Sequence, residues 1–255
     1  MEPGIYDGIS HQDLPSGLSP SGAKTILFGT PAEYLYKRQN PKPPTRSMIL
    51  GTLAHGLILE GKTRYLVCAD GRTKQGKADR ARCEAEGLVA VTQPEADQIE
   101  GMAKAVLEHE LAASILADGK PEQAVIWEDE PTGVTCRGFI DWLRPNAIVD
   151  LKSCQDASPV GFGKAAANLG YDIQSWMYRE AIRQLTGMDL PFLHITVESA
   201  APYLVAVHRL PPEADERGER FTRQALATYA RCVESGIWPG YSEAIIDTTW
   251  PRWAA

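Results

Sequence analysis

The residues that decide the fold are Gly138-Phe139-Ile140-Asp141 and, shortly after, Ile148-Val149-Asp150-Leu151-Lys152. Apolar residues precede each acid, and Pro145-Asn146 between the two runs favours a tight turn. We therefore expect two neighbouring strands in a hairpin. Asp150 and Lys152 are two residues apart, so their side chains leave the same face of an extended strand, and Asp141 can lie opposite them across the ladder. The hairpin would thus gather two carboxylates and one amine.

The composition points to one domain. A chain of 255 residues can bury one sizeable core, and we expect a single domain over residues 1–255. Residues 1–19 are rich in Gly, Pro, Ser and Asp, which predicts an arm or a surface loop. No run of eighteen apolar residues occurs, and the first residues have neither the basic nor the apolar part of a signal peptide. We expect a soluble protein that is not secreted by that route.

The cysteines predict free thiols. Five are present, at positions 68, 83, 136, 154 and 232, and no two form a Cys-x-x-Cys pair. We expect reduced thiols in a cytosol and no zinc or iron–sulfur site.

The net charge of −7 is unevenly distributed. Residues 24–90 contain twelve Lys/Arg and six Asp/Glu, whereas residues 91–255 contain fourteen Lys/Arg and twenty-four Asp/Glu. Carboxylates gathered around metal ions would raise the acidic count, and bound cations would offset it locally. The charge therefore permits a nucleic-acid partner without demonstrating one.

Hydrophobic periodicity predicts an α/β fold with a central mixed sheet flanked by helices. Helical spacing occurs at residues 23–27, 34–36, 47–61, 94–118, 172–185 and 221–233. Period-two patterns predict strands at residues 124–126, 134–143, 148–151, 192–197 and 203–208. The charged stretch 72–87 predicts a surface helix or loop. The basic stretch 62–82, which overlaps it, is either a solvated face or a surface that contacts phosphates.

The hairpin residues suit metal-assisted phosphodiester hydrolysis. This chemistry needs hard oxygen ligands for Mg²⁺, a positioned water and a cation near the developing charge. Asp141 and Asp150 can supply oxygens, and the backbone carbonyl of Leu151 can add another. Lys152 can orient the water and stabilise the phosphate, and Glu122 at the start of the preceding strand can add a carboxylate. An Asp-x-Lys alone is more often an exposed strand end with a salt bridge.

The order of these residues along the chain resembles a known family. His55 at the end of Gly-Thr-Leu-Ala-His, then Glu122, Asp141, Asp150-Leu151-Lys152 and finally Gln174 with Tyr178 are similar to the PD-(D/E)XK nuclease superfamily, in its RecB-type branch. The stretches 18–24 and 30–34, before the His55 helix, resemble the RecE or exonuclease VIII nuclease domain. The similarity covers roughly residues 5–235. Ile140 stands where the superfamily name has proline.

The resemblance implies a Mg²⁺-dependent exonuclease, with Mn²⁺ as a substitute, that degrades the 5′ strand of linear double-stranded DNA. It leaves a 3′ single strand for an annealing protein in phage-type recombination. The matching positions imply His55, Glu122, Asp141 and Asp150 as metal-site residues and Lys152 as the catalytic amine. Gln174 and Tyr178 would close the site.

The same resemblance implies a setting for the protein. We expect a homo-oligomer, with a ring around DNA as one arrangement, no membrane contact, and a place in the cytoplasm of a bacterial or phage-infected bacterial cell.

Two other functions stay open. The chain could be a different end-processing nuclease of the superfamily, such as a CRISPR-associated type without an iron–sulfur cluster. It could also be a DNA-binding module that keeps the fold without catalysis. Taken singly, His55 would more often be a core histidine, and Gln174 with Tyr178 would be an ordinary amphipathic pair.

Overall fold

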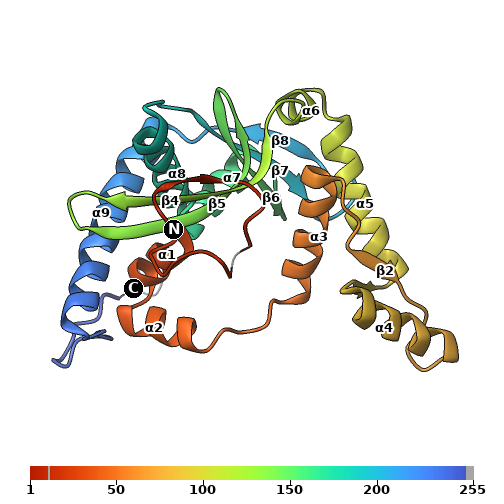
Figure 1. Ribbon diagram of the computed structural model, residues 1–255, viewed down its shortest axis with the longest axis horizontal. Helices are drawn as coiled ribbons and strands as arrows, with labels where there is room; N and C mark the ends of the chain where they lie inside the picture. The colour runs from red at the N-terminus through yellow and green to blue at the C-terminus, as the bar shows by residue number, and fades with distance from the viewer. Residues whose placement is uncertain (11, 251–255) are drawn as a thin grey trace.

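A six-stranded mixed sheet lies at the centre of the computed structural model, which describes residues 1–10 and 12–250 (Figure 1). Its strands have the spatial order β1, β4, β5, β6, β7, β8. Their bounds are β1 Gly4–Tyr6, β4 Lys120–Asp129, β5 Val134–Arg144, β6 Ala147–Cys154, β7 Phe192–Glu198 and β8 Val205–His208. β6 and β7 pair in parallel and the other neighbours antiparallel. The predicted mixed α/β architecture is confirmed.

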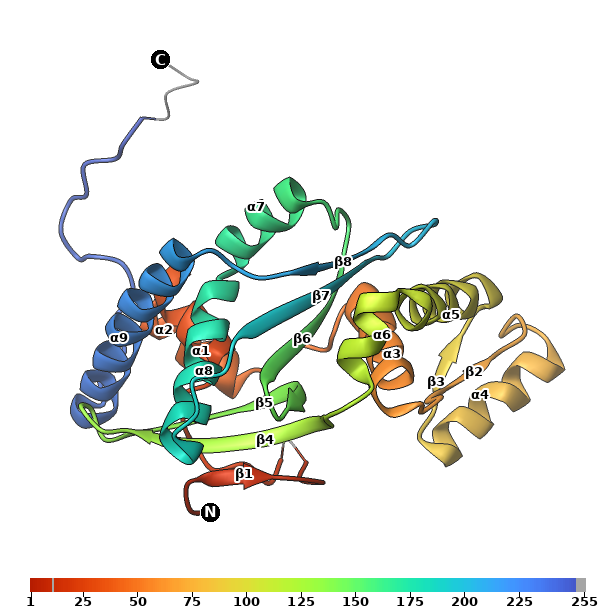
Figure 2. The same ribbon diagram turned by 90° about the horizontal axis from the view of Figure 1, so that it is seen from above.

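Helices cover both faces of the sheet and bury two apolar clusters (Figure 2). The first cluster lies under α1 (Pro20–Phe28), α8 (Tyr171–Thr186) and α9 (Pro212–Ser235). The second lies under α3 (Arg46–Glu60), α5 (Gln93–Glu108) and α6 (Glu110–Leu116). β6 serves both, because Ile148 enters the first cluster while Val149 and Leu151 enter the second. The remaining helices of the main body are α2 (Pro31–Gln39) and α7 (Pro159–Leu169).

A small unit lies beside α3 and α5, which we name the β2–α4–β3 unit (residues 65–91) (Figure 2). It consists of β2 (Tyr65–Val67) and β3 (Val89–Val91), paired in parallel, with α4 (Lys74–Glu86) between them. The sequence predicts a surface helix or loop over 72–87, which is the helix α4, but neither strand, because three residues are too few for a period-two pattern.

Polar caps and prolines fix where the helices begin. Side chains of residues just before α1, α2, α3, α4 and α7 accept hydrogen bonds from the first turn, namely Ser19, Thr30, Thr45, Thr73 and Ser158. Proline follows the cap in α1, α2 and α7, where its missing N–H costs nothing.

Some expected elements differ from those observed. The single helix expected over 94–118 is two helices, because His109 is extended and its Nδ1 accepts from the Ala112 amide at 3.2 Å. Residues 1–19, expected as an arm or loop, include strand β1 on the edge of β4. α9 begins before the expected 221, in a charged turn without apolar periodicity. No helix among the described residues is long and apolar enough to cross a bilayer.

Candidate active site

The β5–β6 hairpin is paired only beside its turn. The pairs are Arg144 with Ala147, Leu143 with Ile148 and Trp142 with Val149. Beyond them β5 continues along β4, and β6 continues along β7. The sheet therefore opens between β5 and β6 at Asp141 and Asp150, which face the opening and are not paired across the ladder as strand spacing predicts.

Other groups satisfy the exposed edge of β5. Leu18 donates its amide to the Thr135 carbonyl at 2.9 Å and accepts from the Arg137 amide at 3.0 Å. The Tyr178 hydroxyl accepts from the Phe139 amide at 3.2 Å. Buried backbone amides need partners, so these contacts keep the opening from closing as a ladder.

Gly138 allows Tyr178 to reach this edge. A Cβ at position 138 would lie 2.5 Å from Cε1 of the Tyr178 ring, which is closer than real contacts allow. Packing against the Tyr178 ring therefore explains why position 138 is a glycine.

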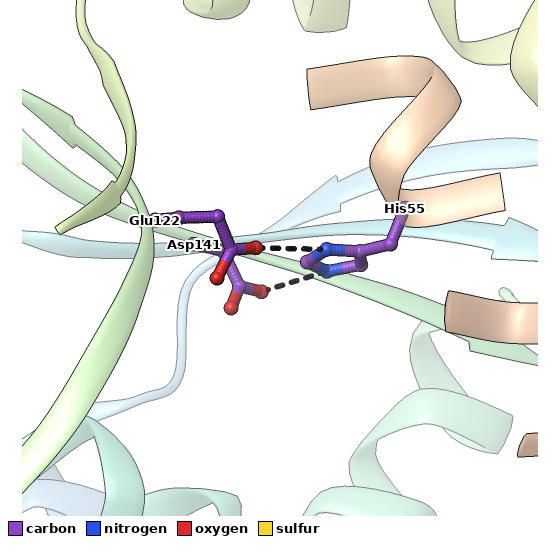
Figure 3. A group of neighbouring side chains, drawn as sticks. All are labelled: His55, Glu122 and Asp141. Atoms are coloured by element: carbon purple, nitrogen blue, oxygen red, sulfur yellow. Dashed lines mark hydrogen bonds and ion pairs between the residues drawn. The ribbon is translucent and has the colours of Figure 1, made fainter. Parts of the chain in front are cut away.

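On the α3 side of the opening, the two ring nitrogens of His55 face two carboxylates, one each (Figure 3). Its Nε2 lies 3.0 Å from Asp141 Oδ2 and 3.2 Å from the Leu151 carbonyl oxygen. Its Nδ1 lies 3.5 Å from Glu122 Oε1. Asp141 Oδ2 also accepts from the Leu151 amide at 2.8 Å. Within residues 1–10 and 12–250, His55, Glu122 and Asp141 are the one group of three or more potential protein side-chain ligands close enough to share a metal.

The donor atoms around His55 Nε2 fit a divalent cation. Ligands about 2.1 Å from one Mg²⁺ in octahedral geometry are about 3 Å from each other. The separations of 3.0 and 3.2 Å from Nε2 to Asp141 Oδ2 and to the Leu151 oxygen match that spacing. Glu122 faces the other ring nitrogen, which suits a carboxylate that fixes the orientation of a metal-binding histidine.

Charge coupling supports this arrangement. Burial lowers the pKa of His55, but the carboxylates of Asp141 and Glu122 outweigh it and raise the pKa to about 10. Burial raises the pKa of Asp141, yet His55 opposes it and the pKa falls to about 2. The imidazolium therefore holds the place of a cation between the two carboxylates.

Glu122 has an unusual backbone. Its φ is 48°, in the left-handed region that non-glycine residues rarely adopt. The flanking pairs Pro121 with Trp142 and Gln123 with Ile140 are intact, whereas Glu122 itself is missing from the ladder opposite Asp141. Strain of this kind is concentrated at functional sites, so Glu122 marks the opening in a way its sequence does not reveal.

Asp150 lies on the α8 side of the opening and is 2% exposed. Its Oδ1 accepts from Lys152 Nζ at 2.6 Å and from Gln174 Nε2 at 2.7 Å. Its Oδ2 is buried and has no partner among the described residues. A buried carboxylate oxygen without a donor is costly, and a cation would satisfy it.

The amine beside Asp150 is held as an ammonium. Burial lowers the pKa of Lys152, but Asp150 and Asp141 outweigh it and raise the pKa. Burial raises the pKa of Asp150 to about 6, with the Lys152 ammonium opposing the shift. The Lys152 ammonium and the Asp150 carboxyl group thus form a partly buried donor–acceptor pair.

A second amine, which is not among the residues predicted from the sequence, belongs to Lys24 of α1. Its Nζ lies 5.7 Å from the centre of the Tyr171 ring, and Lys152 Nζ lies 5.3 Å from the same centre. Burial lowers the pKa of Lys24, and the Lys152 ammonium lowers it further. The sequence does offer one signal for this part of the site. Tyr171 lies three residues before Gln174 and therefore on the same face of α8.

The structure brings most of the predicted residues to the opening. His55, Glu122, Asp141 and the Leu151 carbonyl converge on one side, and Asp150, Lys152 and Gln174 on the other. Tyr178 contacts the backbone of β5, and none of its hydrogen bonds within the described chain reaches an acid. Their metal and catalytic roles stay predictions.

The chain resembles one protein family and several solved structures. A family described as a PDDEXK-like domain of unknown function (DUF3799) matches residues 19–247. No curated protein matches. A crystal structure of a candidate exonuclease from Eubacterium rectale has a TM-score of 0.68 at 15% identity, over 96% of this chain and 97% of that chain. A phage related exonuclease from Haemophilus somnus 129PT has a TM-score of 0.38 at 13% identity, over 87% and 98%. The first likeness supports the fold.

Proposed function

Since this chain belongs to the family of PDDEXK-like domains, we propose that it is a metal-dependent exonuclease acting on linear double-stranded DNA. One observation carries the proposal. At the opening between β5 and β6, His55 Nε2, Asp141 Oδ2 and the Leu151 carbonyl lie at the spacing of ligands around one cation. Lys152 places an ammonium at the same opening.

Mg²⁺ is the proposed metal, with Mn²⁺ as a substitute. His55, Asp141 and the Leu151 carbonyl would hold it, and Glu122 would orient His55. Asp150 lies on the other side of the opening, outside this group, and its Oδ2 has no partner among the described residues; we propose it as a ligand of a second metal or, after movement of its side chain, of the same one. When bound, the metal would lower the pKa of a water molecule and neutralise charge on the phosphate.

The protein side chains would position the substrate. Lys152 carries three N–H donors, of which one faces Asp150, so the others can donate to a water or to a phosphate oxygen. Gln174 fixes the Asp150 carboxylate that orients Lys152. Lys24 adds positive charge beside Tyr171, where a second phosphate oxygen can be attracted.

The finer description rests on the resemblance of the ordered residues to RecE-type nucleases. It includes 5′ to 3′ polarity, 3′ tails for a single-strand annealing protein, phage-type recombination and a homo-oligomer. The description of the Eubacterium rectale protein as a candidate exonuclease agrees with end-dependent action.

Digestion of linear duplex DNA labelled at either the 5′ or the 3′ end tests the proposal. We expect release of the 5′ label with Mg²⁺ or Mn²⁺, no release with a chelator, and no cutting of closed circular DNA. Lys152→Ala should slow release by about a hundredfold or more, whereas Lys164→Ala, which changes an exposed lysine of α7, should leave it unchanged.

Other outcomes would redirect the assignment. Cutting of circular DNA would indicate an endonuclease, and release of the 3′ label would reverse the polarity. DNA binding without metal-dependent digestion would indicate a non-catalytic module of this fold.

A further inference from the structure

Two cysteines meet in the β2–α4–β3 unit, away from the residues of the proposed active site. Cys68 Sγ and Cys83 Sγ are 3.6 Å apart, although fourteen residues separate them in the chain. Cys68 follows β2, and its amide donates to the Val91 carbonyl at 2.9 Å. Cys83 lies in α4, where its carbonyl accepts from the Leu88 amide at 2.9 Å. Both backbones are therefore anchored within one small unit.

The other thiols have different neighbours. Cys136 Sγ faces the Val134 carbonyl at 3.6 Å, and Cys154 Sγ faces the Val197 carbonyl at 3.6 Å. Across the described part of the chain, Cys68 and Cys83 are the one pair of cysteines with sulfurs in contact. A disulfide has an S–S length of about 2.05 Å, so side-chain movement of about 1.5 Å would join them.

We propose that Cys68 and Cys83 are a redox-active thiol pair that forms an intramolecular disulfide with a small disulfide oxidant such as oxidised glutathione. The Cys68 thiolate attacks one sulfur of the oxidant, which breaks that S–S bond and releases one glutathione thiol. The Cys83 thiolate then attacks Cys68 Sγ and releases the second. Two electrons pass to the oxidant, and the two thiol protons end on the released thiols.

Exposure decides which thiol reacts first. Cys83 is 4% exposed, whereas Cys68 is partly exposed. Burial and the contact with Cys83 raise the pKa of the Cys68 thiol; nearby Asp79 raises it too, and Arg80 opposes them. Attack by Cys68 is therefore slow at neutral pH and faster above it.

The cross-link would close the segment between the two cysteines and tie α4 to the end of β2. This segment contains five basic residues, Arg72, Lys74, Lys77, Arg80 and Arg82, and none of the residues of the proposed active site. The inference therefore stands whether or not the chain cuts DNA.

The full chain can be tested in glutathione buffers of increasing oxidised fraction, followed by alkylation of free thiols in denaturant and intact mass measurement. We expect the number of alkylated cysteines to fall from five to three as the buffer becomes oxidising. Trypsin cleaves at the basic residues between Cys68 and Cys83 and so places the two cysteines in different peptides. These two peptides should stay linked without reductant and separate with it. Cys68→Ser should prevent the link, and Cys232→Ser should retain it.

Three results would overturn the proposal. All five thiols could remain alkylated in the most oxidising buffer. The linked peptides could persist in Cys68→Ser. Glutathione could be retained as a mixed disulfide without the internal link. The wild-type measurement needs no substitution, so misfolding of a variant would not leave the outcome open.

Discussion

Next to its turn, the β5–β6 hairpin is an ordinary antiparallel ladder, whereas from Asp141 and Asp150 onward its strands separate. We call residues 142–149 the closed end, and residues 138–141 with 150–152 the open end. At the closed end, Ile148 and Val149 are buried in the two apolar clusters. At the open end, side chains replace the ladder as hydrogen-bond acceptors. The Tyr178 hydroxyl accepts from the Phe139 amide, and the Asp141 carboxylate accepts from the Leu151 amide.

Within this one hairpin, the closed end contributes mainly to stability and the open end carries the residues of the proposed chemistry. The closed end has paired backbone and buried apolar side chains, which favour folding. At the open end, Oδ2 of Asp150 is buried and has no partner within the described chain. Beside it, Glu122 of β4, opposite Asp141, has a strained backbone. Changes to the charged side chains at the open end should therefore alter function more than stability, and changes to the apolar side chains at the closed end the reverse. Gly138 is the exception at the open end, because its role is to make room for Tyr178.

The largest effect is expected for Lys152→Ala at the open end. Loss of a positioned charged donor lowers catalytic rates by about a hundredfold to a thousandfold. DNA digestion rates of Lys152→Ala and the matched Lys164→Ala, measured at equal protein concentration, check this. Equal rates would remove Lys152 from the chemistry.

Gly138→Ala should force the open end apart. The added Cβ would meet the Tyr178 ring at 2.5 Å, and overpacking of this kind costs about 1–3 kcal/mol. Denaturant unfolding gives the change, and Gly138→Ala combined with Tyr178→Ala should recover part of the overpacking cost. A stable single variant would contradict the packing role of Gly138.

Metal binding should depend on pH through His55. In the metal-free protein its pKa is raised from 6.5 to about 10, so its contribution to stability is present below pH 6.5 and lost as pH rises through 10. A metal needs the neutral ring, so affinity should rise about tenfold per pH unit between about pH 7 and 9. Calorimetry in two buffers should show about one proton released per metal. No proton release would count against His55 as a ligand.

Glu122→Gly should relieve strain while weakening function. A left-handed backbone costs a non-glycine residue about 1–2 kcal/mol, partly offset by the greater chain entropy of glycine. We expect unfolding free energy to rise by up to about 1 kcal/mol and digestion to slow. A less stable variant would show that the backbone of Glu122 is not strained.

The closed end supplies the control with the smallest effect. Ile148→Val removes one methylene from a fully buried site and should cost about 1 kcal/mol. Digestion at a temperature where the variant is folded should be unchanged. A large loss of activity would mean that the two ends are not separable.

The sequence predicts much of this site because its signals are local. The hairpin follows from two apolar runs around Pro145-Asn146, and strand spacing places Asp141 and Asp150 just beyond its last pair. The separation of the two strands at these acids does not follow from the sequence. His55 and Gln174 were recognised through their order along the chain. The structure places His55 against Asp141 and Gln174 against Asp150, and their roles stay predictions.

Other features depend on contacts between distant segments. The bridge of Leu18 to β5 and the approach of Lys24 to Tyr171 arise only when α1 packs beside α8. The left-handed backbone of Glu122 has no sequence signal, because glutamate rarely adopts it. The contact of Cys68 with Cys83 likewise needs the unpredicted strands β2 and β3.

The central claim is that the open end of the hairpin binds the metal that cuts DNA. The most direct measurement is the anomalous scattering of Mn²⁺ in crystals of the protein grown at neutral pH. The account predicts a peak within coordination distance of His55 Nε2, Asp141 Oδ2 and the Leu151 carbonyl oxygen, and its loss in His55→Ala. A crystal saturated with Mn²⁺ that shows no peak at these atoms would contradict it.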